Sequence, residues 1–156
     1  MLNTPEFMRE MKRGEEAAVD ALLDSAYGND RARRMVDDLR KSRLIAGEMV
    51  LPMQGEVIGY AALTTIETPK GWLALAPVAI LPDVQGRGYG RRLVGMITEW
   101  ARLSQRRLIS IGNPAFCESC GFTSLPDEIE GNRGDLRAGG AEIAASGALT
   151  LPRPLR

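Results

Sequence analysis

A glycine loop between an apolar segment and an amphipathic segment constrains this chain more than any other feature. The apolar residues end at Leu81-Pro82, glycines follow at 86, 88 and 90, and a helical spacing of apolar residues begins at once. We expect a strand that passes through a tight loop into the N-terminus of a helix. Backbone N–H groups without helical partners and the positive end of the helix dipole meet there, so the loop is a candidate phosphate site.

The composition narrows the classes of function. The 156 residues fit one domain, placed at 1–156, and 20 basic and 20 acidic side chains give no net charge that would indicate nucleic acid binding. No apolar stretch approaches the ~20 residues of a membrane span. Two cysteines, no histidine and no signal-peptide pattern predict a cytoplasmic protein without a metal ion. Its chemistry would use carboxylates, hydroxyls, thiols, backbone groups or water.

The remaining sequence predicts a mixed α/β or α+β domain. Strands are expected at 7–11, 44–51, 56–66, 72–81 and 107–111, and helices at 15–26, around Met35, from the glycine loop to 103, and from 114 to about 120. Residues 126–147 carry little signal, and a final strand is expected near 148–151. Pro77 cannot donate to a β-ladder, so it marks a bulge, an edge or an opening in its strand. One apolar face is expected on the helix after the loop, formed by Leu93, Val94, Ile97, Trp100 and Ala101.

The spacing of the loop glycines excludes two common phosphate-binding motifs. A dinucleotide fold needs Gly-x-Gly-x-x-Gly, but Arg91 or Leu93 stands where the third glycine would lie. A P-loop needs Lys-Ser or Lys-Thr after its last glycine, and Gly90 is followed by two arginines.

Two segments resemble the GNAT superfamily of acyl-CoA-dependent N-acetyltransferases. The residues 85–90, Gln-Gly-Arg-Gly-Tyr-Gly, are similar to that family's Gln/Arg-x-x-Gly-x-Gly/Ala signature, and the Leu-Pro-Asp before them also looks like the family. The segment from Asn113 to Phe122 resembles its Phe-Tyr-Glu-Lys-x-Gly-Phe motif. The resemblance is specific across residues 72–122, and the order of the expected elements agrees with the family from the N-terminus. It is weak beyond Phe122, where the chain is poorly defined. It implies an α+β fold with a mixed, mostly antiparallel central sheet flanked by helices.

The resemblance also implies a binding site for acetyl-CoA or coenzyme A. Backbone N–H groups would hold the pyrophosphate, from the residues Gln85, Gly86, Arg87, Gly88, Tyr89 and Gly90. The side chains of Arg87 and Arg91 either add charge there or are solvated surface groups. The pantetheine arm would pair with open backbone around Ala79 and Ile80, and Asn113 and Phe116 are carried over as further coenzyme contacts.

The proton donors and acceptors are less defined by the resemblance. Many members protonate the leaving thiolate with a tyrosine, and Cys117 occupies that position here. Three interpretations stay open: Cys117 as the acid, water or another group as the acid, or binding with reduced catalysis. Members often place a basic carboxylate on the fourth strand, which has none here, so Glu67 is the nearest candidate and Glu118 the next. An amine desolvated near backbone carbonyls is the alternative without a dedicated base.

The predicted function is acetyl transfer from acetyl-CoA to a primary amine, on a small molecule or a protein, and not on nucleic acid or at a membrane. A non-catalytic acyl-CoA-binding or regulatory module is one alternative. The other is a redox protein, because residues 117–120 form Cys-x-x-Cys, although buried inert thiols are more common. A homodimer is one assembly that the resemblance implies.

Overall fold

The computed structural model describes residues 5–126, 128–142 and 147–156. The strands are β1 (Arg9–Glu10), β2 (Ile45–Met53), β3 (Glu56–Thr65), β4 (Leu73–Ile80), β5 (Arg107–Ser110), β6 (Thr123–Ser124) and β7 (Arg137–Gly140). The helices are α1 (Glu16–Tyr27), α2 (Arg31–Lys41), α3 (Tyr89–Leu103) and α4 (Pro114–Ser119), with 3₁₀ turns at Pro82–Val84 and Arg153–Leu155.

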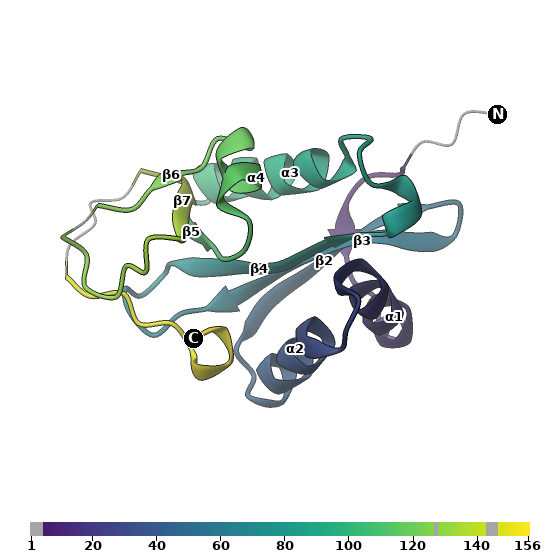
Figure 1. The fold of residues 1–156 in the computed structure, drawn as a ribbon, viewed down its shortest axis with the longest axis horizontal. Coiled ribbons are helices and arrows are strands. Elements are labelled where there is room, and N and C mark those ends of the chain that lie inside the picture. The colour runs from purple at the N-terminus through teal and green to yellow at the C-terminus, as the bar shows by residue number, and fades with distance from the viewer. Residues whose placement is uncertain (1–4, 127, 143–146) are drawn as a thin grey trace.

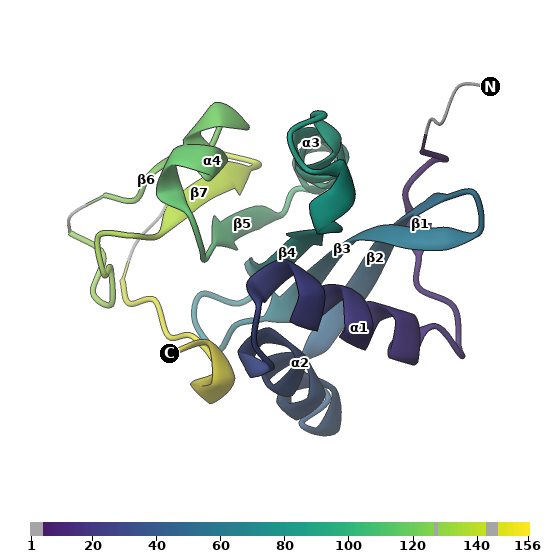
Figure 2. The ribbon, with the colours of Figure 1, turned by 45° about the vertical axis from the view of Figure 1, so that its right-hand side comes forward.

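The strands form one seven-stranded sheet in the order β1-β2-β3-β4-β5-β7-β6 (Figure 1). Only β4 and β5 run parallel, and every other neighbouring pair is antiparallel. Helices α1 and α2 cover one face and α3 and α4 the other, as the turned view in Figure 2 also shows. The predicted mixed, mostly antiparallel sheet flanked by helices is confirmed.

Each face of the sheet has its own apolar layer. Helix α3 buries Leu93 and Ile97 on one side, and α1 buries Val19 and Leu23 on the other. Trp100 was expected in the α3 face, but its side chain is 45% exposed. Residues four apart lie on the same face of a helix, and Ala101, four positions after Ile97, is fully buried. Trp100 therefore lies at the edge of the apolar face.

Strand β4 carries a bulge where Pro77 was expected to interrupt pairing. Ala61 pairs with Val78 and Leu63 with Leu75, so two β4 residues, Ala76 and Pro77, lie opposite one β3 residue. A residue without an N–H fits such an interruption. The bulge divides β4 into a half that pairs with β5 and a half that does not.

The C-terminal part differs from the sequence-based expectation. Among the described residues, the last regular strand is β7 at Arg137–Gly140, inside the stretch that gave little signal, whereas 148–151 contributes only isolated bridges at Ala148 and Thr150. Two glycines weaken a strand prediction because they have low β-propensity. Here the Phe122 ring lies on Gly139, where an added Cβ would meet it at 2.9 Å, so the absence of a side chain permits this packing.

Candidate active site

A cavity opens where β4 and β5 separate. Their parallel pairing ends at Leu75 and Ser110, while β4 continues to Ile80. The resulting cavity has a volume of about 710 Å³. It is lined by Tyr27, Leu75, Val78, Ile80, Val84, Gln85, Gly86, Gly88, Tyr89, Gly90, Arg91, Val94, Ser110, Ile111, Gly112, Asn113, Phe116 and Cys117.

The outer half of β4 offers main-chain groups to this cavity. Leu81 N–H donates to the Ile58 carbonyl at 2.8 Å, which fixes the phase of the β3–β4 ladder. Because hydrogen-bonded and non-bonded pairs alternate along an antiparallel ladder, Ala79 faces β3, whereas Val78 and Ile80 turn their N–H and C=O groups away from it. The open backbone was expected around Ala79 and Ile80. The ladder instead assigns it to Val78 and Ile80, and Ala79 is buried in the core.

The glycine loop closes one end of the cavity. Gly86 and Gly88 have φ angles of 80° and 84°, a conformation that side chains disfavour, and Gly88 is the N-cap of α3. The Gln85 side-chain amide donates to the Ile80 carbonyl at 2.9 Å and so ties the loop to the end of β4. The first N–H groups of α3 have no carbonyl partner in their own helix, so this end suits an anionic group.

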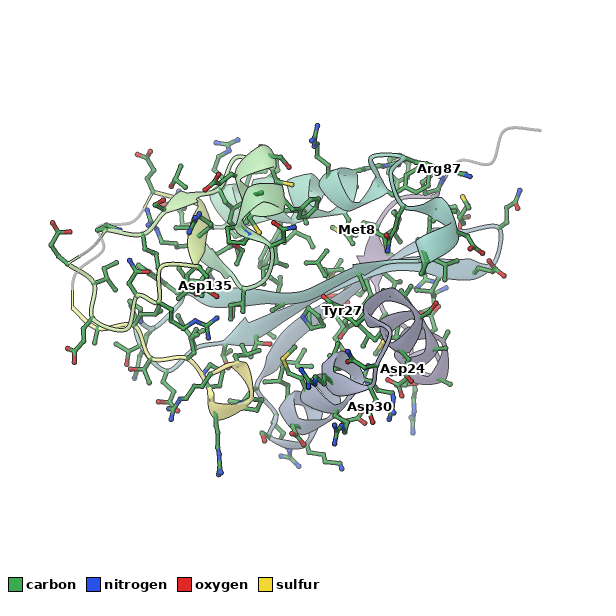
Figure 3. All side chains as sticks on the ribbon, in the orientation of Figure 1. Met8, Asp24, Tyr27, Asp30, Arg87 and Asp135 are labelled. Atoms are coloured by element: carbon green, nitrogen blue, oxygen red, sulfur yellow. The ribbon has the colours of Figure 1, made fainter. Side chains whose placement is uncertain are left out.

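The two arginines near the loop occupy different positions. Both side chains are exposed, but Arg91, in the first turn of α3, lines the cavity, whereas Arg87, in the loop before α3 (Figure 3), is outside the cavity lining. The sequence left both side chains as either phosphate contacts or solvated groups. Their positions favour Arg91 for the first role and Arg87 for the second.

Helix α4 forms a second wall. The Asn113 side-chain oxygen accepts hydrogen bonds from the N–H groups of Ala115 and Phe116 at 3.0 and 3.2 Å, so it caps this helix. The Phe116 ring covers the start of α3, where a Cβ on Gly90 would lie 3.3 Å from the ring. Cys117, only 9% exposed, follows on the cavity side of α4. Asn113, Phe116 and Cys117 are thus brought together with the glycine loop.

Tyr27 is a cavity residue that sequence reasoning missed. It is the last residue of α1 (Figure 3). Its hydroxyl donates to the Val78 carbonyl at 3.0 Å. Burial raises the pKa of the Tyr27 phenol, and the hydrogen bond to Val78 opposes this only in part, so the hydroxyl keeps its proton at neutral pH. The only sequence signal was a polar aromatic side chain directly before the helix-ending Gly28.

The two carboxylates considered as bases lie elsewhere. Glu67 follows the end of β3 that pairs with the start of β4, so it is remote from Val78 along the ladder. Its side chain is exposed, and its carboxylate lies 3.9 Å from the Arg156 guanidinium. Glu118 pairs with Arg137 at 2.8 Å. Glu67 was a candidate because the chain passes from it into β4, but antiparallel pairing places it at the far end of that strand.

The cavity lining contains no Asp or Glu. Across residues 5–126, 128–142 and 147–156, no group of three His, Cys, Asp or Glu side chains could hold a metal ion. None of the helices in these ranges combines the length and apolar character needed to cross a bilayer.

Comparison with known proteins agrees with this geometry. Residues 15–122 match the model of the acetyltransferase (GNAT) family. An uncharacterized N-acetyltransferase of Escherichia coli K12, YhbS, is 28% identical over 109 residues, which are 67% of this chain and 65% of YhbS. The aligned part is thus less than two thirds of this relative.

Two solved structures share the fold at 20% identity. The Escherichia coli YhbS complex with CoA has a TM-score of 0.86 and covers 99% of this chain and 93% of its own. A Brucella melitensis GNAT acetyltransferase in complex with acetyl-CoA has a TM-score of 0.76 and covers 96% and 97%. From the family match over most of its length, this chain is a member of the GNAT acetyltransferase family.

Proposed function

We propose that this protein transfers the acetyl group of acetyl-CoA to a primary amine. The observation that carries the proposal is the cavity that runs from the glycine loop to Val78, between strands that separate after Leu75. It joins an anion-binding end to an open strand edge. The family membership and the CoA and acetyl-CoA complexes of the two similar structures support it.

In this proposal the coenzyme lies along β4. Its pyrophosphate binds the N–H groups at the start of α3, with Arg91 adding charge. Its pantetheine amides bind the peptide groups of Val78 and Ile80 as an added strand would. The thioester then reaches Val78, whose N–H is a donor for the oxygen that gains negative charge when the amine attacks.

The proton steps use the side chains around Val78. An amine must be deprotonated to attack, and because no carboxylate lines the cavity, water removes that proton in our proposal. The leaving thiolate needs a proton donor. Tyr27 of α1 and Cys117 of α4 both line the cavity and carry transferable protons, so Tyr27 joins Cys117 as a candidate acid.

The acceptor is an amine on a small molecule or a protein, and it enters beside Tyr27 at the junction of α1 and α2. We propose that the reaction takes place in the cytoplasm, where thiols such as those of Cys117 and Cys120, which form no disulfide, stay reduced.

A coupled binding and turnover experiment tests the proposal. Calorimetry with acetyl-CoA should show binding of one molecule per chain, and a panel of primary amines should reveal thiol release that depends on both substrates. Absence of binding at millimolar acetyl-CoA would overturn the proposal. Tight binding without turnover across amino acid, polyamine, aminoglycoside and peptide acceptors would instead support a non-catalytic coenzyme-binding module.

A further inference from the structure

The two cysteines lie together at the cavity wall. Cys117 lines the cavity and belongs to the apolar cluster that α3 forms with the sheet, and the partly buried Cys120 packs against that cluster. Both thiols are free. The N–H of Cys120 donates to the Cys117 carbonyl at 3.0 Å, an i to i+3 bond. Side chains at i and i+3 eclipse in such a turn, so the two thiols lie on one side of the chain, and Cys117 is near enough to raise the pKa of the Cys120 thiol.

Cys117 also lies where the coenzyme's sulfur would arrive, an assignment that depends on the proposed coenzyme-binding mode. Pantetheine extended from the glycine loop past Ile80 brings its sulfur to Val78, and the second half of CoA disulfide extends from there along the proposed acceptor entrance beside Tyr27. Val78 and Leu75 pack in the same apolar cluster as Cys117. Cys117 is the only sulfur-bearing residue in the cavity lining.

We propose that Cys117 and Cys120 form a dithiol that reduces the disulfide form of coenzyme A. The Cys117 thiolate attacks one sulfur of CoA disulfide, forms a mixed disulfide with CoA, and releases the other CoA as its thiolate, which takes up a proton. The Cys120 thiolate then attacks the Cys117 sulfur and releases the second CoA. Two cysteine thiols are oxidised to one disulfide, and one CoA disulfide is reduced to two CoA thiols.

The surroundings of the pair suit this order of attack. Cys117 faces the cavity, whereas Cys120 is outside the lining and is positioned to resolve rather than to start the exchange. Burial raises the pKa of the Cys120 thiol, and the Arg91 charge and the Ser119 hydroxyl, 4.0 Å from its sulfur, lower it in part. Cys120 therefore stays largely protonated near neutral pH while the first exchange proceeds.

To test this, the reduced protein is incubated with CoA disulfide. The amount of CoA thiol released and the mass of the intact protein are then measured. The wild type should release two CoA thiols per chain and lose two hydrogens. Cys120→Ser should release one and retain one CoA as a mixed disulfide that dithiothreitol removes. Cys117→Ser should react at least ~10-fold more slowly, because its remaining thiol lies outside the cavity.

Two measurements on the wild type make the test independent of how the variants fold. Acetyl-CoA in excess should slow the reaction by occupying the cavity. Hydroxyethyl disulfide, which lacks the nucleotide and pantetheine, should react more slowly than CoA disulfide at equal concentration. Equal rates for the two disulfides, no protection by acetyl-CoA, or a Cys117→Ser variant as fast as the wild type would each overturn the proposal.

Calorimetry separates this inference from the proposed function. A wild type that binds CoA in calorimetry but does not exchange with CoA disulfide would overturn the dithiol alone. If the wild type does not bind CoA, the binding mode itself is wrong.

Discussion

Two polar regions of the molecule differ in how their polar groups are used. On the α1–α2 face, a charged cluster consists of Asp20, Asp37, Arg40, Glu48 and Tyr60. Arg40 and Tyr60 both donate to one Glu48 oxygen, at 2.8 and 2.6 Å. The cavity between β4 and β5 instead presents mostly main-chain groups and apolar side chains.

The difference separates stabilising groups from binding groups. In the charged cluster, side chains partner one another, and the hydrogen bond to Glu48 and burial both raise the pKa of Tyr60, which stays a neutral donor. In the cavity, Val78 and Ile80 face away from their β3 neighbours, so their N–H groups point toward a ligand, while their carbonyls already accept hydrogen bonds from Tyr27 and Gln85. We infer that the cluster holds the fold and the cavity holds the coenzyme.

The largest effect is expected from Arg40→Leu, which leaves Glu48 and Asp20 without their cation. The free energy of unfolding should fall by about 3 kcal/mol, since breaking a largely buried pair strands the remaining charge. Urea denaturation measures it. Arg34→Leu is the control on the same helix, because its pair with Asp30 is exposed and should be worth under ~0.5 kcal/mol. A large loss of acetyl-CoA affinity in folded Arg40→Leu would contradict the division between the two regions.

Gly88→Ala should affect the cavity instead. A side chain at φ 84° costs roughly 1–3 kcal/mol and shifts the N–H groups at the start of α3, so CoA should bind roughly 10- to 100-fold more weakly. Gly95→Ala is the matched control, a glycine of α3 with open space around it and no positive φ. Calorimetry should find its CoA affinity unchanged. Equal affinities for both variants would remove the loop from the binding site.

Much of this site could be predicted because its signals are local. The glycine loop, the Pro77 interruption and the segment from Asn113 to Cys117 each depend on consecutive residues, and the structure places all three around one cavity. Tyr27 could not be found this way, because its partner Val78 is 51 residues away. Glu67 was wrongly expected near the site because it is close to β4 in sequence. The antiparallel pairing of β3 and β4 places it at the opposite end of β4 from the cavity.

The fold shows the same limit. Strands with alternating or continuous apolar residues were predicted close to their observed bounds, because burial on the sheet requires that pattern. Strand β7 was not predicted, because glycine has a low β-propensity and Gly139 is required instead by its packing against the Phe122 ring.

Tyr27→Phe tests the side of the cavity contributed by α1. Loss of the hydroxyl should lower kcat by about 10-fold, less than the roughly 10²- to 10⁴-fold typical of a lost general acid because Cys117 is a second candidate donor, with little change in the KM for acetyl-CoA. Because the pKa of Tyr27 is raised, wild-type activity should show no decline from this group below about pH 10. A variant with full kcat would exclude Tyr27 as the acid, and Cys117→Ser would then be the variant to compare.

The smallest effect concerns Glu15, which lies outside both regions. Hydrogen bonds from Arg9 and from the Lys12 N–H lower the pKa of its carboxyl to about 2. A lowered pKa stabilises the fold above the ordinary value of 4.5, and this contribution is lost as the pH falls toward 2. Glu15→Gln should therefore be slightly less stable than the wild type at pH 6 and equal to it near pH 2. A difference that is constant with pH would contradict this assignment.

Both proposed activities depend on coenzyme binding along β4 and the glycine loop. Titration of CoA into ¹⁵N-labelled protein, followed by amide chemical shifts, maps that binding residue by residue. The largest changes should occur at Val78, Ile80 and the amides from Gly86 to Arg91, while Glu48 and Tyr60 stay nearly unchanged. Changes concentrated in the charged cluster, or none at millimolar CoA, would contradict the account.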